Sequence, residues 1–242
     1  MHDLLAPEPI LAEAFPRTRQ GRTKCRAPQT APRCFFGPVH YEPGYAYPLV
    51  VWLHGAGEDE RQLGRIMPQV SLRNYVAVAP RGWTQSPARG QRAIAWPDGR
   101  GADAAAETRV YESIAAAMAR YHIGRDRVYL AGQGRGGTAA LRIAVANPRR
   151  FAGAASLGGP LPRDATLFHN LDEARELPLF FGVAEDDAAA AADWDADLRL
   201  LHAAGLQATV FRYLLCEESD DGPSPAMLAD LNRWMMRIVN NT

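Results

Sequence analysis

Short apolar runs alternate with longer segments of helical periodicity from residue 47 onward, and this alternation restricts the fold more than any other feature of the sequence. The run YPLVVWLHG (47–55) is largely apolar and ends at a glycine, and a helical pattern follows near residues 59–70. Continuous apolar strands joined by helices are typical of a parallel sheet covered on both faces, because neither face of such a sheet meets water. The sequence therefore predicts an α/β fold with a mostly parallel central sheet.

The same alternation continues toward the end of the sequence. Further strands are expected at residues 74–80, 127–132, 151–159, 177–183 and 208–215, and helices at residues 104–121, 137–147, 188–204 and 227–238. Residues 1–33 are rich in proline and arginine and have no sustained periodicity, which predicts an N-terminal arm followed by one domain over 34–242. Hydrophobic residues make up 47% of the 242 residues, enough for a single domain with a buried core.

Charge and cysteine content exclude several functional classes. Twenty-seven basic side chains balance 27 acidic ones, so no overall field favours nucleic acid or an anionic membrane surface. No apolar run is long enough to span a bilayer, and the first residues lack the pattern of a secretion signal. Cys25, Cys34 and Cys216 lack metal-ligand spacing, as expected for reduced thiols. We therefore expect a cytoplasmic protein with a small-molecule ligand and without cofactor, nucleic-acid or membrane partner; the sequence carries no signal for an oligomeric state.

A glycine-rich stretch, AGQGRGG (131–137), lies between an expected strand and an expected helix. Gly132, Gly134 and Gly137 fit the G-x-G-x-x-G pattern, in which helix amides hold the pyrophosphate of a dinucleotide. That pattern also needs an acidic residue about 20 positions later for the ribose hydroxyls. Residues 156–159 are Ser-Leu-Gly-Gly, without a carboxylate. Nucleotide binding is therefore the weaker of two interpretations.

The second interpretation is a sharp turn of the form G-x-S-x-G, which raises a nucleophilic serine above the sheet of a hydrolase. In this register Gly132 and Gly136 are the flanking glycines, and Gly134 occupies the position of the serine. A glycine there has no atom that could attack a carbonyl, although it relieves about 1–2 kcal/mol of strain from a positive φ. The turn alone does not decide between the two interpretations.

Several segments, taken in order, resemble the α/β-hydrolase superfamily, specifically its phospholipase/carboxylesterase and polyhydroxyalkanoate-depolymerase-like esterases. Together they cover roughly residues 39–240, and they are PLVVWLHGAGEDE, RNYVAVAPRG, AIAWPD, RVYLAGQGRGG, FAGAASLGGPLP, LPLFFGVAEDD and PAMLADLNRWMM. The resemblance implies the α/β-hydrolase fold, a three-layer sandwich with helices on both faces of the sheet. It also implies acyl-transfer chemistry, which needs a nucleophile, a histidine base, a carboxylate and oxyanion-binding amides.

When the family's functional residues are matched to this sequence one by one, the resemblance implies that the oxyanion site is present. The segment His-Gly-Ala-Gly (54–57) matches the first oxyanion loop, with the Ala56 amide as a donor and Gly57 beside it. Arg135 follows the nucleophile position, and its amide supplies the second donor. His54 is expected to brace the loop rather than to act as a base. The electrostatic part of the machinery is therefore expected to be present.

The catalytic residues do not transfer in the same way. Gly134 leaves the nucleophile position vacant. The family's histidine lies between the last strand and the closing helix, where this sequence has Asp221 at or next to that position and no histidine. Glu185 or Asp186 takes the place of the acid in the turn GVAEDD, as a remnant without an imidazole to orient.

Carboxylates near the carboxyl edge of the expected sheet allow a metal site to be considered, because hard cations bind several carboxylate oxygens. The acidic residues concerned are Glu185, Asp186, Glu217, Glu218, Asp220 and Asp221. No D-x-D-x-D-G spacing supports a calcium loop, so two solvated acidic loops are the preferred interpretation and no metal is predicted.

These observations predict an esterase-like protein with a degenerate triad, a pseudo-hydrolase that retains a ligand pocket. One alternative is a binding or regulatory module for a small anion at the oxyanion amides, where Arg135 adds positive charge. Another is hydrolysis by different chemistry, with Asp221 or Glu185 as a general base acting on water.

Overall fold

The computed structural model describes residues 31–85, 93–96, 102–162, 170–185, 188–214 and 222–241. Residues Ala31–Thr242 form one compact unit. Residues 1–30 of the expected N-terminal arm lie outside the described residues. Arg33, which the sequence assigned to the arm, is the first residue of strand β1 (Arg33–Phe36).

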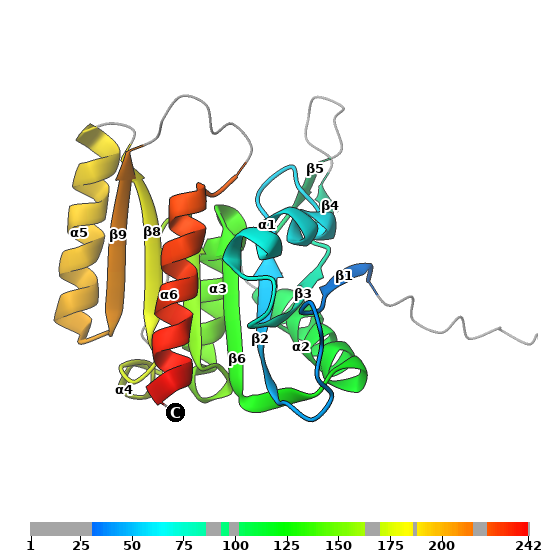
Figure 1. Ribbon diagram of the computed structural model, residues 1–242. Helices are drawn as coiled ribbons and strands as arrows, with labels where there is room; N and C mark the ends of the chain where they lie inside the picture. Colours follow the sequence, from blue (N-terminus) through cyan, green and yellow to red (C-terminus); the bar gives the residue numbers. More distant parts are fainter. Residues whose placement is uncertain are drawn as a thin grey trace, which may run out of the picture. The chain divides into compact units, whose positions relative to one another are not determined.

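The central sheet of the described part has seven strands in the order β1-β3-β2-β6-β7-β8-β9 (Figure 1). Strand β1 pairs with β3 in the antiparallel direction, and every other neighbouring pair is parallel. The prediction of a mostly parallel sheet is thereby confirmed. The bounds of the remaining strands are β2 (Tyr47–Leu53), β3 (Val76–Pro80), β6 (Ile123–Gln133), β7 (Gly153–Leu157), β8 (Leu179–Glu185) and β9 (Ala208–Leu214).

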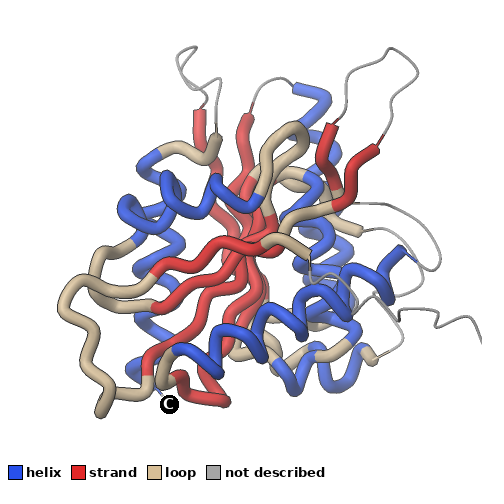
Figure 2. Tube along the Cα trace, turned by 90° about the vertical axis from the view of Figure 1, so that its right-hand side faces the viewer, coloured by secondary structure: helices blue, strands red, loops and turns tan. Residues whose placement is uncertain are grey.

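Helices cover both faces of this sheet, as Figure 2 shows with strands in red between helices in blue. Helices α1 (Leu63–Val70) and α6 (Pro225–Asn241) pack on one face. Helices α2 (Ala102–Arg120), α3 (Arg135–Ala146) and α5 (Ala188–Ala204) pack on the other. The result is the three-layer sandwich expected of the α/β-hydrolase fold.

The sequence of β2 explains this double coverage. All seven of its residues are buried, and successive side chains of a strand point to opposite faces. Val51 and Leu53 accordingly join the apolar cluster under α2 and α3, whereas Val50 and Trp52 join the cluster under α1 and α6. A continuous apolar run is therefore what a central strand of this fold requires.

Several smaller elements differ from the sequence expectation. The helix expected near 59–70 begins with a separate 3-10 turn, η1 (Glu60–Gln62), because the Asp59 carboxylate accepts from the Arg61 amide at 2.9 Å and caps that turn. Strand β1 and the hairpin β4 (Trp83–Gln85) and β5 (Ala93–Ala95) were not expected. These strands have three or four residues, too few for a period-two pattern to be recognised. The short elements η2 (Pro148–Arg150) and α4 (Leu171–Ala174) complete the described part.

The parallel register brings two strand ends together. Leu53, the last residue of β2, lies opposite Gly132, the penultimate residue of β6. The segments that follow these strands therefore emerge side by side at the carboxyl edge of the sheet, where sites of open α/β sheets are found. Within the described residues, no helix has the length and apolar character needed to cross a membrane.

Candidate functional site

The glycine-rich stretch forms a sharp elbow between β6 and α3. Gly134 joins the two elements with φ 51° and ψ −123°, a conformation that residues with a Cβ adopt only under strain. Its amide donates to the Leu157 carbonyl at 2.9 Å, and its carbonyl accepts from the Thr138 amide at 3.0 Å. Strand, strained turn and helix are the geometry of a hydrolase nucleophile elbow.

The flanking glycines allow this elbow to pack closely. A Cβ at Gly132 would overlap the backbone of Gly136, and a Cβ at Gly136 would overlap the carbonyl oxygens of Leu53 and His54. Both positions therefore need glycine because other backbone segments lie against them. Close approach of strand and helix, rather than phosphate binding, accounts for these two glycines.

Gly134 is in a different environment from its neighbours. It is partly exposed, and no atom of the described residues lies within 4 Å of the position that its Cβ would occupy. The tip of the elbow therefore has room for a side chain, but the residue there supplies neither a nucleophile nor a proton acceptor.

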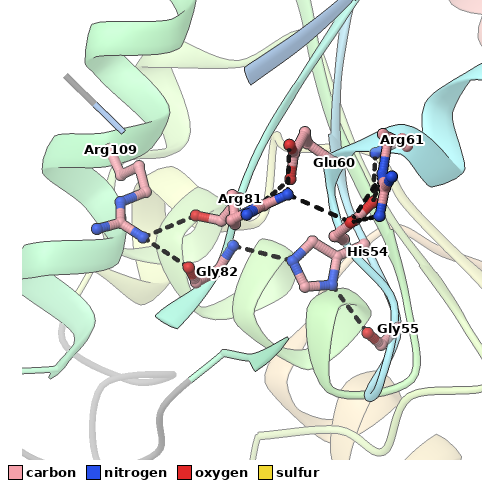
Figure 3. Close-up of polar contacts among 8 residues, drawn as sticks. His54, Gly55, Glu60, Arg61, Arg81, Gly82 and Arg109 are labelled. Atoms are coloured by element: carbon pink, nitrogen blue, oxygen red, sulfur yellow. Dashed lines mark hydrogen bonds and ion pairs between the residues drawn. The ribbon is translucent and has the colours of Figure 1, made fainter. Parts of the chain in front are cut away.

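His54 follows β2 and braces the adjacent loop from within the core. The Gly82 amide donates to Nε2 at 2.9 Å, so the ring proton is on Nδ1, which donates to the Gly55 carbonyl at 2.8 Å (Figure 3). Trp96 Nε1 donates to the His54 carbonyl at 3.1 Å. Burial lowers the pKa of the imidazole, which keeps it neutral. The ring holds the loop in place and faces no solvent, as expected for a bracing role.

The loop after His54 carries the predicted oxyanion donors. Ala56 is exposed, and its amide has no acceptor among the described residues. The Gly57 amide, predicted to lie beside this donor, instead donates to the Ile94 carbonyl of β5 at 3.2 Å. Gly57 therefore fastens the loop to the hairpin. Arg135 is exposed at the first position of α3, where backbone N–H groups carry the positive end of the helix dipole.

Ion pairs connect the residues that follow this loop to Arg81, the residue after β3 (Figure 3). The Arg81 guanidinium binds Glu60 through two hydrogen bonds, Nε to Oε2 at 2.5 Å and Nη2 to Oε1 at 2.9 Å. It also donates to Asp59 Oδ2 at 3.3 Å. Hydrogen bonds from the Arg61 side chain to the same carboxylate lower the pKa of Asp59. The residues after β3 are thus fixed to the turn η1.

Arg109 of α2 extends this connection to the opposite face of the sheet. Its Nη1 donates to the carbonyls of Arg81 at 2.7 Å and Gly82 at 2.9 Å (Figure 3). Its guanidinium lies 3.6 Å from the centre of the Trp83 ring, which provides a cation–π contact. The Gly82 amide in turn donates to His54. Arg109 therefore positions the loop after His54 indirectly, through Gly82.

Gln133 is a site residue that the sequence analysis did not identify. It lies between Gly132 and Gly134, and its Oε1 accepts from Gln62 Nε2 at 2.5 Å. Gln62 Oε1 in turn accepts from Trp52 Nε1 at 2.7 Å. The available signal was a polar residue at the end of an otherwise apolar strand, directly before the nucleophile position.

The carboxylates named from the sequence are largely outside the described residues. Asp186 and Asp221 lie there, as do Glu217, Glu218 and Asp220. The backbone of Glu185 ends β8 and pairs with Leu214 of β9, which places residue 185 at the carboxyl edge of the sheet. Among the described residues, no group of His, Cys, Asp or Glu side chains could hold a metal ion.

Two cavities lie at the opposite, amino edge of the sheet. One of about 260 Å³ is lined by residues that include Tyr45, Arg73 and Met236. Another of about 420 Å³ lies between α5 and the start of β9, beside Leu198 and His202. Neither contains a residue of the elbow, so the candidate site is defined by backbone geometry and hydrogen-bond donors rather than by these cavities.

The elbow above a mostly parallel sheet, together with a loop from the neighbouring strand, defines an α/β-hydrolase-fold protein. More specifically, the chain belongs to the esterase family, because the family model described as "Putative esterase" matches residues 28–211. A comparison with curated proteins finds no significant match.

Solved structures share this fold at low sequence identity. Arabidopsis thaliana SOBER1 is 21% identical with a TM-score of 0.66, and the alignment covers 80% of this chain and 100% of that chain. Zea mays acyl-protein thioesterase 2 is 15% identical with a TM-score of 0.65, covering 86% of this chain and 99% of the other. The Bacillus cereus carboxylesterase is also 15% identical with a TM-score of 0.65, covering 87% and 96%.

Proposed function

We propose that this esterase-family chain is a pseudo-hydrolase that binds a small anionic ligand at the elbow and does not use serine-hydrolase chemistry. The observation that carries the proposal is Gly134, which occupies the tip of the elbow in the strained conformation of a nucleophile and has no side chain. An acyl-enzyme cannot form on a residue without a nucleophilic atom. The segment 215–224, where the family's base would lie, contains no histidine.

Binding is supported by what remains around Gly134. The exposed Ala56 amide and the positive N-terminal end of α3 lie on the two segments that emerge side by side at the carboxyl edge. Donors of this kind stabilise an oxyanion in a hydrolase and bind a carboxylate or phosphate in the ground state. The Arg135 side chain, exposed at the start of the helix, adds a positive charge.

Thermal unfolding in the presence of acetate, butyrate or inorganic phosphate tests ligand binding. At about ten times the dissociation constant, a bound anion raises the stability by about 1.4 kcal/mol, which is about 3–5 °C in a chain of this size. Arg135→Ala should reduce the shift. If none of the three anions stabilises the native protein, the binding proposal is wrong.

Restoring the catalytic residues tests the absence of hydrolysis. We expect the native chain to show no stoichiometric fluorophosphonate labelling and no turnover of p-nitrophenyl butyrate above buffer. In Gly134→Ser with Asp221→His, a hydroxyl and an imidazole return to the positions inferred for nucleophile and base. Labelling of residue 134 in this double variant, with none in Gly134→Ala with Asp221→His, would support the proposal. Labelling or turnover by the native chain would refute it.

A further inference from the structure

A buried row of side-chain amides fixes the orientation of Gln133. Trp52 is fully buried and its indole nitrogen can only donate, so the Gln62 atom that it contacts at 2.7 Å must be the oxygen. Gln62, 2% exposed, therefore turns its Nε2 toward Gln133. Since Nε2 is a donor, the Gln133 atom that receives it is Oε1. The direction of each amide follows from the indole and not from an arbitrary assignment.

This orientation leaves the donor end of Gln133 without an acceptor among the described residues. The side chain is partly exposed. The amide lies against the start of the oxyanion loop, because a Cβ at Gly55 would be 3.1 Å from its Cδ. A Cβ at Gly222, which follows the position inferred for the base, would be 3.9 Å from its Oε1.

Gln133 is thus held between the oxyanion loop and residue 222, directly before the vacant nucleophile position. Its oxygen accepts one hydrogen bond from the buried Gln62, and its nitrogen carries two N–H donors. The hydrogen bond from Gln62 restricts the rotamer of Gln133 before any ligand binds. A side chain restricted in this way loses little conformational entropy on binding, which favours its use in recognition.

We propose that Gln133 is a ligand-binding residue of the elbow site and that its Nε2 donates to an anionic oxygen of the ligand. This inference rests on the proposed function, which supplies the anion at the same site. The shared chemistry is an acceptor oxygen of a carboxylate or a phosphate, and butyrate and inorganic phosphate separate these two sources. The Gln62–Trp52 pair acts as a positioning group that does not contact the ligand.

The chain offers a nearly isosteric test, Gln133→Glu. The glutamate keeps an oxygen that accepts from Gln62 Nε2, but it loses both N–H donors and gains a negative charge. Gln133→Met removes the same donors without adding charge. The matched control is Gln69→Glu, since Gln69 is exposed on α1 and, within the described ranges, donates only to the Arg65 carbonyl of its own helix.

The measurement is the titration of the thermal shift with butyrate and with inorganic phosphate at constant ionic strength, after circular dichroism has shown that each variant is folded. We expect the affinity for the anion that binds the native chain to fall about 10-fold or more in both Gln133 variants, because a hydrogen bond to a charged group is lost. Gln69→Glu should bind as the native chain does.

The alternative outcomes separate the two proposals. If the native chain binds an anion and both Gln133 variants bind it equally well, the inference is wrong while the proposed function stands. Loss in Gln133→Glu alone would indicate repulsion by a nearby charge and would refute direct donation. If the native chain binds neither anion, the proposed function fails and the inference fails with it.

Discussion

The base of the elbow, at Gly136, and its tip, at Gly134, differ in the space that they leave for a side chain. At the base, a Cβ on Gly136 would overlap the carbonyl oxygens of Leu53 and His54. At the tip, no atom of the described residues lies within 4 Å of a Cβ on Gly134, although φ there is 51°. Packing therefore requires glycine at the base, whereas only backbone strain favours it at the tip. Crowding by the described residues therefore does not account for glycine at position 134.

Gly136→Ala is expected to break the base of the elbow and to have the largest effect. The new methyl group must displace the backbone of β2 or α3, because carbonyl groups and not flexible side chains occupy its space. We expect a loss of about 3 kcal/mol or more in the free energy of unfolding, measured by urea denaturation. Gly64→Ala is the control, since Gly64 is exposed on α1 with open space around it and should gain up to about 1 kcal/mol.

Arg109→Met tests whether α2 stabilises the loop after His54 through the hydrogen bonds of Arg109 to Arg81 and Gly82. The variant keeps an apolar stem but loses the hydrogen bonds to the Arg81 and Gly82 carbonyls and the contact with Trp83. We expect the free energy of unfolding to fall by about 2 kcal/mol. Arg237→Met, at an exposed arginine of α6, should change it little. If the two variants changed the free energy of unfolding equally, Arg109 would have no special role in positioning the loop.

Gly134→Ala places a methyl group at the tip of the elbow. The methyl group meets open space, so the expected loss is only the strain of the positive φ, about 1–2 kcal/mol in urea denaturation. A loss as large as that of Gly136→Ala would mean that the tip is packed like the base.

The sequence predicted the fold from its strongest signals, and it predicted the elbow from the glycines together with the resemblance of the surrounding segments to esterases. The seven buried residues of β2 and the segments that resemble esterases were sufficient for the α/β-hydrolase fold. Hydrogen bonds between distant segments could not be predicted in the same way. The Gly57 amide is satisfied by Ile94 of an unexpected hairpin, and nothing in the segment His-Gly-Ala-Gly (54–57) indicates that partner.

Gln133 illustrates the same limit. Its proposed role follows from a partly buried hydrogen bond with Gln62, a residue 71 positions earlier in the chain. A polar residue at the end of a strand has many possible roles in sequence terms, and only the indole of Trp52 fixes which end of the amide is available. Motifs within one segment could therefore be predicted, whereas hydrogen bonds between residues of distant segments could not.

Acidification is expected to lower the free energy of unfolding through His54. This effect should be smaller than those of the three substitutions above. Burial lowers the pKa of His54 below its usual value near 6.5, so the unfolded chain binds the extra proton first as the pH falls. Stability should therefore decrease between pH 6.5 and 5.5 by at most about 1.4 kcal/mol from this group. The measurement is urea denaturation of the native chain and of His54→Gln at both pH values. The same pH slope in both would exclude His54 as its source.

The hydrogen bonds that hold the oxyanion loop also have a consequence for folding kinetics. His54 and Gly82 are 28 positions apart, and Arg109 joins carbonyls 28 and 27 positions before it. Contacts of this separation require the two ends of the intervening segment to come together, which costs loop-closure entropy. The loop therefore reaches its native shape only when β2, the turn after β3 and α2 have come together. The proposed anion site also needs β2 beside β6, whose paired residues Leu49 and Val128 lie farther apart in the chain, so anion binding should appear late in refolding.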